Sequence, residues 1–143
     1  MRSNKIEPRR HEDHEDTVQK HNFERLSKDV VDCCFQVHQK LGSGLLEDLY
    51  QEPLCIELEK KRLSYELEKQ IPVYYDGLQL KRSCRLDFVV EGLIVLELKA
   101  VEKILPVHEA QILTYLKVAD LKTGFIVNFK DPYFKTAIKR FVL

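Results

Sequence analysis

Two short apolar segments, interrupted by three charged residues, constrain the fold of this chain more than any other feature. The segments 85–90 and 93–100 predict adjacent strands, because each is almost wholly apolar and a Glu-Gly turn separates them. An unpaired buried charge is costly, so Asp87, Glu97 and Lys99 need a chemical explanation. Glu97 and Lys99 are two positions apart and therefore project from the same face of their strand.

An Asp on the neighbouring strand can join the Glu and the Lys at one end of the sheet. Two carboxylates and an ammonium group that converge there suit a hard divalent cation and an activated water. This is the chemistry of phosphodiester hydrolysis. The alternative is an exposed ladder of salt bridges at a strand end. The flanking residues disfavour that alternative, because they are apolar on both faces, which is typical of an interior strand.

The length and composition indicate one domain preceded by a charged segment. At 143 residues the chain can bury one substantial core. Residues 1–22 carry five basic and five acidic side chains and almost no aliphatic ones. We therefore expect a disordered charged tail over 1–22 and a single domain over 23–143. The run 11–16 in this tail resembles a metal-binding tract but has no scaffold to hold its ligands.

Neither a membrane span nor a disulfide framework is apparent in the sequence. No apolar run approaches the roughly 20 residues that a span requires, and the N-terminus lacks the apolar stretch of a signal peptide. We therefore expect a cytoplasmic protein that does not enter a membrane. The four cysteines lack the spacing of a zinc site, which favours free thiols in a reducing compartment.

The net charge of zero is not typical of a protein that coats nucleic acid. Local basic patches can still bind phosphate, because their position matters more than the total. The candidate patches are 60–62, 81–82 together with Arg85, and 139–140. A solvated surface explains the first and the third of them.

The remaining pattern predicts an α/β fold. Apolar residues recur at three- and four-residue steps from Phe23 to a helix end at Gly42. The other expected elements are a helix over 45–62, strands over 65–75, 78–90 and 93–99 with a hairpin turn at 76–77, a helix over 106–121, and strands over 124–129 and 137–143. Pro53 should kink the second helix or shift its first turn. The β-α-β unit over 93–129 should be right-handed, with parallel strands in a mixed central sheet flanked by helices, in the order α-α-β-β-β-α-β-β.

Further polar residues are spaced so that they can reach the same site. Glu47 follows the joint between the first two helices and shares a helix face with Tyr50. It can serve as a third carboxylate, or as an ordinary first-turn Glu that favours the helix dipole. Gln111 lies one turn after His108 and one turn before Tyr115. An amide in an apolar stripe needs a partner, which favours a functional Gln111, whereas Tyr115 can pack in the core and His108 can be a surface residue.

These residues resemble the PD-(D/E)XK nuclease superfamily, whose core is an α-β-β-β-α-β unit of this order. Asp87, followed by Glu97-Leu98-Lys99, matches the motif that names the superfamily. More narrowly, the chain is similar to a small GxxExxY family (PDDEXK_3-like) over residues 24–131. The matching segments are 44–50, 96–102, 111–116 and 124–129. The resemblance implies a restriction-endonuclease-like core.

The resemblance also implies roles for individual residues. Asp87, Glu97 and Glu47 would bind Mg²⁺, or Mn²⁺ in its place. Lys99, Glu47 and Gln111 would act in catalysis. The expected substrate-binding residues are Tyr115, His108, Arg85 and Tyr50.

The sequence thus favours a Mg²⁺-dependent nuclease that acts on DNA through direct attack of an activated water on phosphorus, and it leaves RNA open as a substrate. The domain has no separate DNA-binding module, so we expect a second subunit or a partner, most simply a homodimer. One alternative is a catalytically silent module of the same fold that binds nucleic acid or a protein, which the zero net charge favours. The other is a metal-dependent hydrolase of a different phosphate ester.

Overall fold

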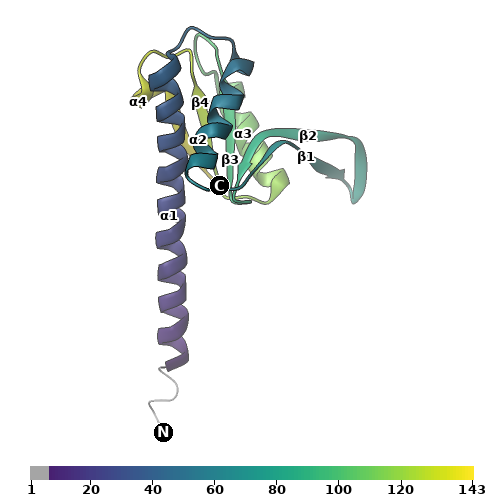
Figure 1. Ribbon diagram of the computed structural model, residues 1–143. Coiled ribbons are helices and arrows are strands. Elements are labelled where there is room, and N and C mark those ends of the chain that lie inside the picture. The colour runs from purple at the N-terminus through teal and green to yellow at the C-terminus, as the bar shows by residue number, and fades with distance from the viewer. Residues whose placement is uncertain (1–6) are drawn as a thin grey trace.

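A five-stranded mixed sheet with the strand order β1-β2-β3-β4-β5 forms the centre of the molecule (Figure 1). The structure is a computed structural model that describes the backbone of residues 7–143 and the side chains of residues 17–143. The strands are β1 (Tyr65–Tyr75), β2 (Leu78–Val90), β3 (Ile94–Lys99), β4 (Thr123–Asn128) and β5 (Ile138–Val142). The helices are α1 (Glu7–Leu41), the 3₁₀ turn η2 (Glu47–Tyr50), α2 (Gln51–Lys60), α3 (Pro106–Ala119) and α4 (Phe134–Ala137).

The strand pairing confirms the predicted fold class. Consecutive strands pair antiparallel, except that β3 and β4 are parallel. Helix α3 connects these two, as the expected crossover requires. The final strand, predicted over 137–143, is β5 at the sheet edge and begins at Ile138. The single turn α4, which is too short to give a periodic pattern, precedes it.

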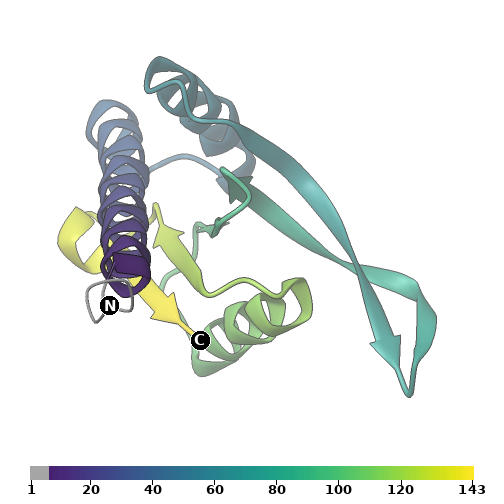
Figure 2. The same cartoon turned by 90° about the horizontal axis from the view of Figure 1, so that it is seen from below.

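Alternate residues of β3 pack into two cores on opposite faces of the sheet. Ile94, Leu96 and Leu98 contact the core formed with α1 and α2, and Val95 packs into the core formed with α3. Figure 2 shows α1 and α3 on either side of the strands. Because side chains alternate along a strand, Glu97 lies on the same face as Val95. The carboxylate of Glu97 is therefore on the α3 side of the sheet.

Helix α1 ends as predicted but begins earlier. Gly42 has a φ of +74°, and its N–H donates to the carbonyl of His38 at 2.8 Å, which closes the C-terminal cap. The helix begins at Glu7, so the segment 7–22 is helical where a disordered tail was expected. Glu, Arg, Lys and Gln favour helix, and extending a packed helix avoids the cost of nucleation. Residues 17–22 are all exposed, and the side chains of the acidic, His-containing run 11–16 lie outside the described residues.

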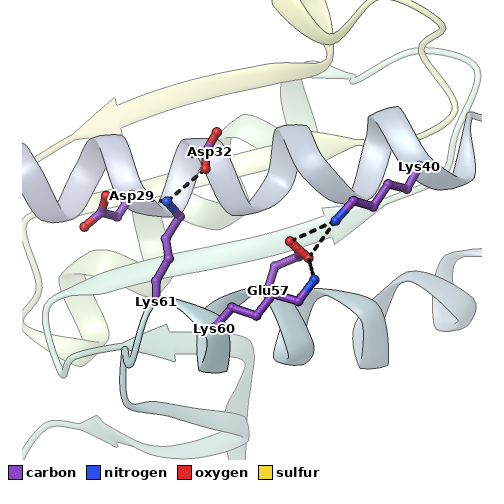
Figure 3. A network of polar contacts seen from close by, with 6 residues as sticks. All are labelled: Asp29, Asp32, Lys40, Glu57, Lys60 and Lys61. Atoms are coloured by element: carbon purple, nitrogen blue, oxygen red, sulfur yellow. Dashed lines mark hydrogen bonds and ion pairs between the residues drawn. The ribbon is translucent and has the colours of Figure 1, made fainter.

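Ion pairs attach α2 to α1 (Figure 3). The carboxylate of Glu57 accepts hydrogen bonds from Lys40 at 3.3 Å and from Lys60 at 3.1 Å. Lys61 at the end of α2 pairs with Asp32 of α1 at 2.9 Å. Glu57 is only 9 % exposed, so its contacts bridge the helices at the border of the core.

The predicted helix over 45–62 is divided into two parts. Residues 47–50 form the 3₁₀ turn η2, and α2 begins at Gln51. Pro53 then lies in the first turn of α2, where its missing N–H costs no helical hydrogen bond. The shifted first turn that Pro53 predicted is therefore confirmed.

The β1–β2 hairpin projects from the body of the molecule (Figure 1). Its turn is the predicted Asp76-Gly77, with φ angles of +49° and +76°. We call residues 69–86 the arm. At the tip of the arm, Tyr75 and Leu78 pair with each other and are both at least 70 % exposed. Within residues 7–143, no helix is long and apolar enough to cross a membrane.

Candidate active site

The pairing of β2 with β3 stops where the two predicted carboxylates begin. The last backbone pair is Phe88 with Leu96. Beyond it, the N–H of Asp87 donates to Glu97 Oε1 at 3.2 Å, and the N–H of Leu98 donates to Asp87 Oδ2 at 2.9 Å. The two carboxyls thus satisfy backbone donors that the ladder no longer pairs. This arrangement holds both carboxyls between the separating strands.

A backbone distortion accompanies the end of this pairing. On the β1 side, Leu67 pairs with Phe88 and Lys69 pairs with Leu86, so Glu68 lies across from Asp87. Glu68 has a φ of +47°, a conformation that costs a residue with a side chain about 1–3 kcal/mol. Strain of this kind is tolerated where the surrounding structure enforces it, and here it lies opposite a candidate metal ligand.

Glu97 is held in a site that disfavours its charge. Its side chain is only 6 % exposed. Burial, and then the negative charge of Asp87, raise the pKa of Glu97 to about 8, while the ammonium of Lys99 acts in the opposite direction. Without a cation, Glu97 therefore tends to be protonated at neutral pH. A divalent cation between Glu97 and Asp87 could replace that proton.

Lys99 ends β3 two positions after Glu97 and therefore on the same face of the strand. Burial raises the pKa of Glu97 and of Glu47, and the positive charge of Lys99 only partly opposes both increases. The chain after Lys99 is fixed by Asn128, whose side chain accepts from the Val101 N–H at 3.0 Å and donates to the Val101 carbonyl at 2.8 Å. Asn128 is 4 % exposed and was not among the predicted site residues. The signal that could have found it is a lone amide in the otherwise apolar strand β4.

Glu47 is brought to the site from the helical side. Partial burial and the negative charge of Asp87 raise its pKa. Tyr50 fixes the joint from which Glu47 extends: its hydroxyl donates to the carbonyl of Gly42 at 2.8 Å and accepts from the N–H of Leu45 at 3.1 Å. The Tyr50 ring is fully buried and stacks on Phe129 at 4.2 Å. Tyr50, expected to bind substrate, has its ring and hydroxyl occupied inside the protein and is better explained as a positioning residue.

Helix α3 borders the carboxylates through two of its predicted residues. Gln111 Nε2 donates to the hydroxyl of Tyr115 at 2.8 Å. Burial, and then the negative charge of Glu97, raise the pKa of Tyr115. Tyr115 packs against the α3-side core that contains Val95, the β3 residue two positions before Glu97. The amide–hydroxyl pair can therefore present hydrogen-bonding groups at the edge of the site.

The last two predicted residues differ in position. Arg85 lies on β2 two positions from Asp87, and its guanidinium is 3.9 Å from Oε1 of Glu68, the residue across from Asp87. His108 caps the start of α3 instead, because its Nδ1 accepts from the N–H of Leu105 at 3.0 Å. The structure therefore brings Arg85 to the site and gives His108 a structural partner away from it.

The donor set fits a hard cation that keeps much of its water. Among the described side chains of residues 17–143, no group of three or more His, Cys, Asp or Glu residues is placed to hold a metal ion, so Glu47 does not join Asp87 and Glu97 as the third ligand that the sequence predicted. Mg²⁺ commonly takes one or two protein carboxylates and retains several waters, so Asp87 and Glu97 suffice for it. Mn²⁺ accepts the same oxygen ligands. A structural zinc site, which needs four protein ligands, does not fit.

The fold and this arrangement define a class of proteins with a restriction-endonuclease-like α/β core. A family model, PDDEXK_3, described as PD-(D/E)XK nuclease superfamily, matches residues 24–141. The chain belongs to this superfamily, as the resemblance in its motifs predicted. No curated protein and no solved structure gives a significant match to the chain.

Proposed function

We propose that this protein is a Mg²⁺-dependent nuclease that hydrolyses phosphodiester bonds of DNA. The observation that carries the proposal is the pair Asp87 and Glu97, held between separating strands, with Lys99 two positions from Glu97 on the same face of β3. Neither core packing nor a surface ion pair explains two adjoining carboxyls of which one is almost fully buried. Superfamily membership supports the same conclusion.

Each residue has a role that its position supports. Asp87 and Glu97 would hold the cation, with Glu47 contributing through a water. Bound there, Mg²⁺ would supply an activated water and neutralise charge on the phosphate. Lys99 would stabilise the negative charge that develops on the phosphoryl oxygens. Gln111 would orient the substrate or the attacking water by hydrogen bonds, with Tyr115 fixing its amide.

Cleavage of a panel of DNA forms tests the proposal. Supercoiled, single-stranded and four-way-junction DNA would be incubated with wild type in Mg²⁺, Mn²⁺ or EDTA. Lys99→Ala and Glu97→Ala are compared with Lys122→Ala, which removes an exposed lysine at the opposite end of β4. We expect metal-dependent cleavage by wild type and Lys122→Ala, and a loss of at least about 100-fold in both site variants.

The same experiment separates the nuclease from the silent binding module. Equal cleavage by wild type and both site variants would assign the activity to a contaminant or to another site. No cleavage of any DNA, together with DNA binding that survives Glu97→Ala, would favour the module. Turnover of a small phosphate ester without DNA cleavage would favour the third class of hydrolase.

A further inference from the structure

The β1–β2 hairpin turns over where the arm leaves the body of the molecule. In β2, Phe88 packs into the core formed with α1 and α2, whereas Leu86 packs into the core formed with α3. Residues two apart on a regular strand point to the same face, but these two are buried on opposite faces of the sheet. The reversal therefore falls within residues 86–88, and Asp87 is the residue between the two faces.

Strand β1 turns over along the same stretch. Tyr65 packs against the core formed with α1 and α2, and Ile71 packs against the core formed with α3. The two residues are an even number of positions apart, so they would share one face of a regular strand. The pairing register of β1 with β2 is the same on both sides of Glu68, so no extra residue is inserted here. The change of face is therefore a twist of both strands at the position where Glu68 lies across from Asp87.

Glu68 has a backbone conformation that interrupts the regular alternation of a strand. Among the strand residues, all of which lie within the described part of the chain, only Glu68 has a positive φ, of +47°. A residue of this type rarely adopts that region, and its carboxylate is 55 % exposed and 3.9 Å from Arg85, a contact too weak to enforce it. Leu86 and Phe88 are fully buried on opposite faces. Their burial enforces the twist, because a regular strand would expose one of them.

The twist changes the direction in which Asp87 points. On a regular strand, side chains project from the faces of the sheet, and backbone groups bond to the next strand. The carboxylate of Asp87 instead accepts from the N–H of Leu98 on β3 at 2.9 Å. The N–H of Asp87 donates to Glu97 Oε1 at 3.2 Å. Asp87 therefore extends along the sheet toward β3 and takes the place of a backbone partner.

We propose that Glu68 is a positioning residue whose left-handed backbone turns the carboxylate of Asp87 toward Glu97. This inference rests on the proposed function, because Asp87 is a proposed metal ligand. The effect comes from the backbone at position 68 and not from the Glu68 carboxylate. The residue there should thus be replaceable according to its tolerance of a positive φ. Gly should serve as well as Glu, whereas a β-branched residue should not.

Four variants of residue 68 test this dependence. Glu68→Gly accepts the positive φ, and Glu68→Gln removes only the charge. Glu68→Val and Glu68→Thr both resist the positive φ, because they are β-branched. The matched controls are Asp120→Gly and Asp120→Val, since Asp120 has a φ of +56° at the C-terminal cap of α3. Asp120 precedes the start of β4, at the opposite end of that strand from Asn128.

The first measurement is hydrogen exchange of the Leu98 N–H by NMR in EDTA. It is expressed relative to exchange of the Ile126 N–H in β4, between β3 and β5, so that a change in global stability affects both alike. The second measurement is the Kd of Mg²⁺ by titration calorimetry. We expect both β-branched variants to lose about tenfold in relative Leu98 protection and about tenfold in Mg²⁺ affinity. Glu68→Gly, Glu68→Gln and the Asp120 variants should stay within about twofold of wild type, because none of them moves Asp87.

Several results would overturn the inference. They are Leu98 protection in the β-branched variants that matches wild type, an equal loss in Glu68→Gln or Glu68→Gly, and an equal loss in Asp120→Val. An unprotected Leu98 N–H in wild type would overturn it as well. Because the exchange is measured without a divalent cation, it is independent of metal binding and hydrolysis. Loss of Leu98 protection in Glu68→Val, without Mg²⁺ binding by wild type, would keep the positioning role and reject the metal site. Mg²⁺ binding by wild type with Leu98 protection that is unchanged in Glu68→Val would do the reverse.

Discussion

At the scale of single residues, the site contains a carboxyl in surroundings that disfavour its ionised form. The Glu97 carboxyl is buried beside Asp87, and burial raises its pKa to about 8. A site built only for stability would place an amide or an apolar group there. Under the proposed function, a bound cation compensates this charge. Replacing Glu97 should then abolish metal binding without lowering the stability of the metal-free protein.

Glu97→Gln should leave the metal-free protein at least as stable as wild type at neutral pH, because the amide keeps the shape and hydrogen bonds without the buried charge. Added Mg²⁺ should raise the Tm of wild type, since a ligand that binds only the folded state stabilises it, and should leave the variant unchanged. Thermal unfolding in EDTA and in Mg²⁺ measures both effects, with Glu24→Gln on the exposed side of α1 as the control. An equal Mg²⁺-induced change in Tm in wild type, Glu97→Gln and Glu24→Gln would show that Glu97 is not a metal ligand.

Glu57 predicts a pH dependence that is separate from the active site. The hydrogen bond from Lys60, and then that from Lys40, lower the pKa of Glu57 in the folded state. Its ion pairs therefore stabilise the protein above the unfolded pKa of about 4.3, and this contribution is lost as the pH falls through the folded pKa. Because both lysines are more than half exposed, the effect should be no more than about 1 kcal/mol.

The measurement is the difference in Tm between wild type and Glu57→Gln across pH 3 to 7. We expect wild type to be the more stable at neutral pH and the difference to shrink as the solution is acidified. Glu59→Gln is a control on the same helix, where the carboxylate contacts Tyr65 rather than a lysine. A difference that is constant over this range would show that the ion pairs do not carry the pH dependence.

At the scale of elements, the geometry of the site depends on how two strands end. Lys99 is the last residue of β3, and Asn128, its partner on β4, holds Val101 by two side-chain hydrogen bonds. These two hydrogen bonds extend the pairing of β3 with β4 by one residue pair and fix the direction in which the chain leaves β3. The position of Lys99, the lysine with the proposed catalytic role, is therefore set partly by the neighbouring strand.

Asn128→Ala should leave the N–H and carbonyl of Val101 without their partners and cost about 1–3 kcal/mol. DNA cleavage should fall as well, because Lys99 loses the fixed backbone beside it. Asn128→Asp retains an acceptor for the N–H but no donor for the carbonyl, so it should be intermediate. Chemical denaturation and cleavage rates measure the two effects. Full activity in Asn128→Ala would show that the hydrogen bonds between Asn128 and Val101 do not position Lys99 for cleavage.

Elements with a local cause were predictable from the sequence, and those with a tertiary cause were not. The hairpin turn at Asp76-Gly77, the cap at Gly42 and the parallel crossover all follow from local backbone chemistry or chain handedness. The residues of the candidate site were also identifiable, because charges in apolar strands are conspicuous. The end of β2–β3 pairing at Phe88 was not, since it depends on how the neighbouring strands twist. The roles of Tyr50 and Asn128 were not predictable either, because they depend on contacts with residues distant in sequence. Tyr50 stacks on Phe129, and Asn128 binds the backbone of Val101.

At the scale of the whole molecule, we expect the extension of α1 to lie outside the folding unit of the domain. The helix continues beyond the body of the protein (Figure 1), and residues 17–22 are exposed. Deleting residues 1–21 should therefore change the free energy of unfolding by less than about 1 kcal/mol, while circular dichroism should show a loss of helix. A larger destabilisation in chemical denaturation would mean that the extension is part of the folding unit and that the boundary at residue 23 is misplaced.

The number of sites in the whole molecule limits how the proposed nuclease would cut DNA. Each chain has one set of Asp87, Glu97 and Lys99, so a monomer would cut one strand in each binding event. A homodimer, which we propose as the working form, would place two such sites on one duplex. Sedimentation should then give twice the mass of the chain, and supercoiled DNA should be converted to the linear form with little nicked circle. The matched measurement is a mixture of wild type with excess Lys99→Ala. Mixed dimers with one intact site should accumulate nicked circles, whereas independent monomers would give the same products at a rate set by the wild-type concentration alone.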